Sequence, residues 1–151
     1  MCPNARTCWP GMTIASYSLN TGGDKELLLR RACMIAILAI RTASTVVVII
    51  FNPLSVGVVS IIIGVLGFFF VAYFLHLIGS MVGERKVFGK YFTKWHFDAF
   101  LFGTALLQVA LLVAACFGFN GSVVNGLWTA LGLAIFVVAW VATWPPELRG
   151  T

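Results

Sequence analysis

Charged residues are scarce in this sequence. Asp, Glu, Lys and Arg make up 10% of its 151 residues, whereas hydrophobic residues make up 60%. A soluble domain usually carries about 25% charged and roughly 45–50% apolar residues. The low charge therefore excludes an ordinary water-soluble domain and predicts that most of the chain lies within a lipid bilayer.

Sequence motifs for catalysis are also missing. The chain contains no HExxH, no CxxC, no nucleophile elbow, no phosphate-binding glycine loop and no catalytic pair of carboxylates. Its four cysteines do not form a secreted disulfide framework, because two precede the apolar runs and two lie within them. We therefore expect no enzyme, no cofactor and no metal site. Cys2 and Cys8 could accept a palmitoyl group, although free thiols are the simpler interpretation.

Four long apolar runs account for most of the chain. A bilayer core about 30 Å thick requires roughly 20 apolar residues per helix, and each run reaches that length. The runs are continuously apolar and far longer than the roughly 9–11 residues of a barrel strand. The sequence thus predicts an all-α, integral membrane four-helix bundle with up-down topology. The predicted helices cover residues 28–51, 54–78, 97–119 and 123–143.

Lys and Arg residues alternate with uncharged turns along the chain. Apart from Arg41, they occur before or at the start of the first run, between the second and third, and after the fourth, whereas the short turns at 52–53 and 120–122 carry none. The positive-inside rule therefore places a flexible tail (1–23), the loop 80–96 and the C-terminal tail (145–151) in the cytosol, around a domain of residues 24–144. Plasma membrane and endomembrane both remain open. The net charge of +5 reflects topology rather than nucleic-acid binding.

The cytosolic loop 80–96 is rich in basic and aromatic residues. Such a composition is typical of a short amphipathic segment on the inner leaflet, where each basic residue contributes about 1 kcal/mol. Anionic lipid is its expected partner, although charges that only orient the chain are an equal alternative. The expected headgroup residues are Arg85, Lys86, Lys90, Lys94 and Trp95.

Arg41 lies within the first apolar run. A charge near the bilayer centre costs from about 3 to more than 10 kcal/mol, so this side chain needs acceptors. Gln108 in the third run lies at the same depth and is the nearest neutral partner, while Ser44 and Thr45 share the helix face of Arg41. We expect a polar stripe that faces the bundle or a partner protein. An oligomeric channel or transporter that uses Arg41 and Gln108 is the alternative.

Asp98, at the start of the third run, is the carboxylate nearest to the arginines of the first run. It comes within range of Arg41 only if the third helix begins before residue 97; otherwise we expect it to pair with Arg30 or Arg31. Asp98 and the two histidines, His76 and His96, also form a loose ring at the cytosolic end. That ring could bind a metal or relay protons, but it lacks a histidine pair at helical spacing, so an enzyme is the weakest hypothesis.

Small residues recur along the second run. The four-residue spacing of Ser60 and Gly64 allows another helix to approach closely. We expect close packing here and at two similar pairs, in preference to a ligand pocket. The expected packing residues are Gly57, Ser60, Gly64 and Gly67 in the second run, Ala99 and Gly103 in the third, and Gly126 and Ala130 in the fourth.

A basic residue in the first helix and an acidic residue at the start of the third form a recognisable pattern. The basic residue is Arg30, Arg31 or Arg41, and the acidic one belongs to Trp95-His96-Phe97-Asp98. This pattern resembles the MARVEL family and its plant CASP-like relatives. The resemblance covers about residues 28–144. It implies a non-enzymatic membrane organiser that self-associates. We therefore expect a scaffold or accessory subunit that binds itself or other membrane subunits through lateral helix packing. The short outer turns argue against an adhesion role.

Overall fold

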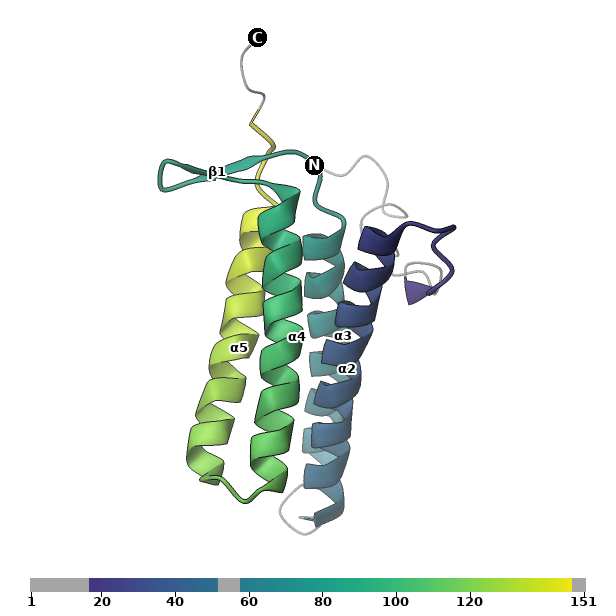
Figure 1. The fold of residues 1–151 in the computed structure, drawn as a ribbon. Coiled ribbons are helices and arrows are strands. Elements are labelled where there is room, and N and C mark those ends of the chain that lie inside the picture. Colours follow the sequence, from purple (N-terminus) through teal and green to yellow (C-terminus); the bar gives the residue numbers. More distant parts are fainter. Residues whose placement is uncertain (1–16, 52–57, 148–151) are drawn as a thin grey trace.

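Four helices form an antiparallel bundle in the computed structural model, which describes residues 17–51 and 58–147. Successive helices run in opposite directions, and a two-stranded hairpin lies across one end of the bundle (Figure 1). The predicted four-helix fold is confirmed. The elements are α2 (Lys25–Phe51), α3 (Val58–Gly79), β1 (Arg85–Val87), β2 (Lys90–Phe92), α4 (Lys94–Cys116) and α5 (Gly121–Ala142).

The helices pack in a square. Helix α2 packs against α3 and α4, and α5 packs against the same two helices. Helices α2 and α5 therefore lie diagonally across the bundle. We call the end that carries β1 and β2 the hairpin end, and the end with the short α4–α5 connection the turn end (Figure 1).

Polar caps determine where the helices begin. Asp24 accepts hydrogen bonds from the backbone of Glu26 and Leu27, at 3.1 and 3.2 Å, and so caps α2, which begins at Lys25 rather than residue 28. Asn120 accepts a hydrogen bond from the backbone of Ser122 and so caps α5. Helix α4 begins at Lys94 rather than residue 97, since its first turn is polar and a hydropathy pattern detects only the apolar part.

The tightly packed core lies nearer the hairpin end. One side chain from each helix is almost completely buried there: Ile37, Leu75, Leu101 and Ile135. Towards the turn end, by contrast, α3 exposes nearly all its side chains. The apolar surface of the bundle is therefore greatest at the end remote from the hairpin.

Three helices are long and apolar enough to cross a membrane. These segments are Ile61–Gly79, Lys94–Cys116 and Gly121–Ala142, and no more than 28% of each is buried within the bundle. Most of their apolar side chains therefore face outward. The composition of these helices suits lipid contact on the outer faces, as expected for membrane spans.

The loop between α3 and α4 contains a β-hairpin, which the residue pattern does not predict. Its strands are antiparallel, and Lys86 is paired with Tyr91. Both turn residues, Phe88 and Gly89, have positive φ (48° and 80°), as a type I′ hairpin turn requires. The hairpin projects sideways from the bundle, with Phe88 fully exposed near its tip (Figure 1).

Residues that precede α2 contact the bundle from Tyr17 onward. The Tyr17 hydroxyl donates to the carbonyl of Ala72 on α3 at 3.1 Å, and burial raises the pKa of this phenol. Arg31 donates to the carbonyl of Ser18 at 2.6 Å. The described part of the predicted flexible tail is thus held against α2 and α3, whereas residues 1–16 lie outside the described residues.

Candidate functional site

A bidentate ion pair joins α2 to α4 near the hairpin end. Arg30 donates from Nε to Oδ1 of Asp98 and from Nη2 to Oδ2, both at 2.6 Å. The two side chains are only 8% and 29% exposed, and a planar guanidinium matches a carboxylate in this arrangement. Of the two partners expected for Asp98, the structure selects Arg30, because Arg31 is directed to Ser18.

Arg41 reaches across the diagonal of the bundle to α5. Its Nη2 donates to the carbonyl of Trp128 at 3.5 Å. A Cβ atom at Gly132 would lie 3.4 Å from the same nitrogen, so the absence of a side chain at Gly132 makes room for the guanidinium. The expected bond between Arg41 and Gln108 is not formed among the described residues.

The Arg41 guanidinium is poorly satisfied by the residues that the structure describes. A guanidinium carries five N–H donors. Among the described residues, Arg41 makes one side-chain hydrogen bond, at the 3.5 Å limit, and its buried Nε has no partner. Such a cation is costly in a low-dielectric environment unless other acceptors approach it.

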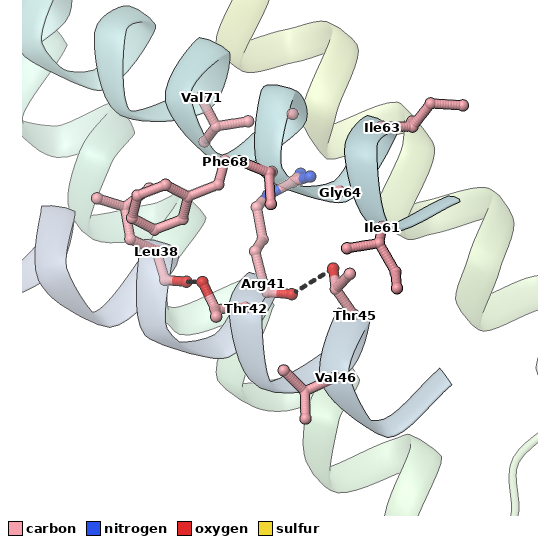
Figure 2. A pocket seen from close by; sticks show the side chains of 12 residues that line it. Leu38, Arg41, Thr42, Thr45, Val46, Ile61, Ile63, Gly64, Phe68 and Val71 are labelled. Carbon is pink, nitrogen blue, oxygen red and sulfur yellow. Dashed lines mark hydrogen bonds between the residues drawn. The ribbon is translucent and has the colours of Figure 1, made fainter. Parts of the chain in front are cut away.

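A cavity of about 580 Å³ lies beside Arg41, between α2 and α3 (Figure 2). Two threonines in its wall bond to their own helix: Thr42 donates to the Leu38 carbonyl and Thr45 to the Arg41 carbonyl. Ser44 likewise donates to Ile40. In the predicted polar stripe, the hydroxyls of Ser44 and Thr45 therefore donate to carbonyls of their own helix. The Arg41 guanidinium, by contrast, keeps N–H donors without a partner among the described residues. The cavity is lined by Leu38, Arg41, Thr42, Thr45, Val46, Ile61, Ile63, Gly64, Val65, Gly67, Phe68 and Val71.

Of the predicted packing glycines in the described residues, Gly64 makes the close contact. A Cβ there would lie 3.0 Å from Cγ2 of Thr45 on α2. At Gly67, Gly103 and Gly126 a Cβ would meet nothing within 4 Å, so these three make no close contact within the bundle. Ala99 and Ala130 are exposed. Gly57 and the side chain of Ser60 lie outside the described residues.

Two further close approaches involve glycines that the spacing rule misses. Gly79 would place a Cβ 3.1 Å from Sδ of Met34, and Gly132 contacts Arg41. Neither glycine has a small residue four positions away that points to the same neighbour. Only the partner side chain, a long Met or Arg from another helix, shows why a glycine is required at each position.

Gln108 is buried in the bundle, where it is 0% exposed. Within the described part of the chain, neither its amide oxygen nor its amide nitrogen has a hydrogen-bond partner. Gln108 is also absent from the wall of the cavity beside Arg41. The two polar groups predicted to form one path are therefore separated by the packing of the helices.

Arg85 departs from the predicted headgroup role. It is 6% exposed, and its guanidinium donates to the carbonyls of Val82 at 2.8 Å and Ala142 at 3.4 Å. Ala142 ends α5, where a cation compensates the negative end of the helix dipole. Burial lowers the pKa of Arg85, but a guanidinium remains charged. Arg85 thus joins the hairpin to α5 and does not face the surface.

Arg85→Gln should loosen the hairpin and the segment after α5. The substitution removes the charged N–H donors beside the Ala142 carbonyl, and a cation at the C-terminal end of a helix stabilises the fold by roughly 0.3–2 kcal/mol. Hydrogen exchange is expected to accelerate by about tenfold at the amides of β1, β2 and Glu147, whose N–H donates to Glu84. Lys86→Gln, an exposed neighbour, is the matched control; equal acceleration in both variants would contradict this role.

The other basic residues of the hairpin region are on the surface. Lys86, Lys90 and Lys94 are exposed, and Trp95 is 72% exposed. The Nζ atom of Lys86 lies 5.6 Å from the centre of the Tyr91 ring. These residues form a basic and aromatic surface at the hairpin end, which corresponds to the predicted headgroup set without Arg85.

The loose ring of His76, His96 and Asp98 does not form a metal centre. His96 Nδ1 accepts a hydrogen bond from the Thr93 backbone at 3.2 Å, as part of the cap of α4. Both carboxylate oxygens of Asp98 are bonded to Arg30. In residues 17–51 and 58–147, no three His, Cys, Asp or Glu side chains are grouped so that they could hold a metal ion.

The fold and site define a small four-helix bundle with an interhelical ion pair at one end and a half-buried cation beside an apolar cavity. No family model matches the chain, and no curated protein or solved structure matches it either. The resemblance to the MARVEL family therefore stays a prediction.

Proposed function

We propose that this chain is a multi-pass membrane protein that acts without catalysis, as an organiser or accessory subunit, through lateral helix packing. The observation that carries this proposal is the exposure of α3 near the turn end. Between Val58 and Phe70 every residue whose burial is described is exposed, except Gly64, although almost all of them are apolar. This segment of α3, residues 58–70, offers a large apolar surface to lipid or to another helix.

The distribution of charge supports four spans with both ends in the cytosol. Basic residues of α2 and of the hairpin region gather at the hairpin end, while residues 117–120 of the turn end carry no charge. By the positive-inside rule the hairpin end is cytosolic, and α2 is the fourth span. The exposed lysines and Trp95 then lie at the level of anionic headgroups, which are the proposed lipid partners.

Short outer turns direct contacts into the bilayer. Only a few residues connect α4 to α5, between Cys116 and Gly121, so little of the described chain projects beyond the turn end. A partner must then be met laterally or at the cytosolic face. Among lateral surfaces, the exposed segment of α3 is flanked by the cavity beside Arg41.

Gly67→Leu tests lateral packing at this surface. Gly67 has open space around its Cβ position, so the leucine leaves the bundle intact but adds bulk to the exposed segment of α3. We expect at least half of the complex extracted in native nanodiscs to shift towards the mass of the 16.4 kDa chain. Gly103→Leu, which also meets nothing within 4 Å but lies on α4, is the matched control. A single-chain mass for the unmodified protein would refute the proposal.

A channel formed by several copies would require Arg41 and Gln108 on a shared, water-accessible surface. Gln108 is completely buried inside one bundle and does not line the Arg41 cavity. The geometry therefore favours packing over conduction.

A further inference from the structure

We propose that the cavity between α2 and α3 receives a carboxylate from a transmembrane helix of a different protein, and that Arg41 is its partner. This inference rests on the proposed function, because it specifies what the accessory subunit binds. The relevant observation is the juxtaposition of a half-buried cation that has free donors with an apolar cavity of about 580 Å³ (Figure 2).

The chain cannot neutralise Arg41 with its own carboxylates. It contains five acidic residues, and all of them lie at the hairpin end, before or early in α2, in the hairpin region, early in α4, or after α5. The deepest of them, Asp98, is paired with Arg30, and Arg41 lies 11 residues beyond Arg30, which corresponds to about 16 Å of helix. The five residues are Asp24, Glu26, Glu84, Asp98 and Glu147.

A second copy would not supply the missing acceptor either. A copy inserted in the same orientation places its acidic residues at the same end, and even its Asp98, level with Arg30, then lies about 16 Å from the depth of Arg41. Its Asp98 is also already paired with Arg30. The carboxylate must therefore come from a different protein, on a helix that carries Asp or Glu near mid-membrane.

Lipid phosphates are poorly placed to serve as this acceptor. Arg41 precedes the end of α2 at Phe51 by ten residues, or about 15 Å. Long side chains on a helix lean towards its N-terminus, so the guanidinium points away from the nearer, turn-end headgroups. Headgroups at the hairpin end are still more distant. A membrane-embedded carboxylate meets Arg41 without deformation of the bilayer.

The walls of the cavity suit a helix. Gly64 and Gly67 contribute no side chains to the α3 wall of the cavity, and Gly64 already brings α3 close to Thr45. The remaining wall is almost entirely aliphatic or aromatic, as a transmembrane partner requires. A carboxylate bonded to Arg41 would be charge-assisted and bidentate in the manner of the pair between Arg30 and Asp98.

The test uses synthetic transmembrane peptides and the full chain in vesicles of neutral phosphatidylcholine. One peptide is a leucine helix with a single central Asp; matched peptides carry Asn or Leu there. Association is measured by energy transfer between labelled peptide and protein. We expect the Asp peptide to bind about tenfold more tightly than the Leu peptide, and the Asn peptide to fall between them.

Variants assign that preference to Arg41. Arg41→Gln should abolish it and Arg41→Lys should retain part of it, whereas Lys90→Ala should leave it unchanged. Equal binding of the Asp and Leu peptides to the unmodified chain would overturn the inference without need of any variant. A fluorescent fatty acid could also displace the Asp peptide from the unmodified chain but not from Arg41→Gln. That result would overturn the inference and would indicate a fatty-acid site.

The two proposals can fail separately. If native assembly is sensitive to Gly67→Leu but no peptide preference is found, lateral packing stands and the carboxylate partner is rejected. If the chain is extracted alone yet prefers the Asp peptide, the site stands and the proposed role as a subunit is rejected.

Discussion

Asp98→Ala should be the most destabilising single substitution at the hairpin end. It leaves the Arg30 guanidinium, 8% exposed, without its carboxylate. Removal of one partner from a buried ion pair usually costs roughly 3–5 kcal/mol, because the remaining charge stays desolvated. Partial exposure of Asp98 places the expected loss in the free energy of unfolding at about 3 kcal/mol. Unfolding in a mixed-micelle denaturant titration measures it.

The adjacent arginines provide the control for this prediction. Arg30→Gln should be costly, whereas Arg31→Gln should cost less than about 1 kcal/mol, because the exposed Arg31 side chain bonds, within residues 17–51 and 58–147, to the Ser18 backbone and side chain. The reversed pair, Arg30→Asp with Asp98→Arg, should recover part of the loss. Similar costs for Arg30→Gln and Arg31→Gln would show that the ion pair does not hold α2 to α4.

Gln108→Met should raise stability. The amide of Gln108 is completely buried and unpaired within the described residues, and an unsatisfied buried polar group costs roughly 1–3 kcal/mol. Methionine has a similar length and volume, so it fills the same space without desolvating an amide. We expect an increase of about 1–2 kcal/mol in the free energy of unfolding, measured in the same titration.

Gln108→Ala separates the polar effect from packing. It also removes the amide but leaves a cavity, so its stability should fall below that of Gln108→Met by roughly 2 kcal/mol or more. A loss of stability in Gln108→Met would mean that the amide is satisfied, by a bound water or by a partner, and would refute the prediction.

The pairing of Asp98 illustrates how far residue patterns reach. The positions of Arg30, Arg31 and Asp98 in the sequence place all three at one end of the bundle, which limits the partners to two. The choice of Arg30 depends on the rotation of α2 about its axis, and that rotation is determined by the packing of Ile37 and its neighbours within the core of the bundle. Apolar runs of this uniformity contain little information about rotation, because almost every face is hydrophobic.

Arg85 illustrates where prediction fails. Its sequence context is a run of loop lysines, so its charge indicates surface exposure and lipid contact. The hairpin turn at Phe88 and Gly89 folds the loop back, and the last carbonyls of α5 then lie beside Arg85. This contact joins residues 57 positions apart, and no local pattern specifies it.

Taken by itself, the sequence determined the four helices, the common end at which basic and acidic residues gather, and the depth of Arg41. These follow from composition and helix length alone, since hydrophobic runs of about 20 residues and the positions of charges need no tertiary information. Only the tertiary structure decided that Arg41 crosses to Gly132 rather than to Gln108, and that Gly64, Gly79 and Gly132 are the close contacts. The reason is that such contacts depend on which helices are diagonal and how each is rotated, and both are set by packing.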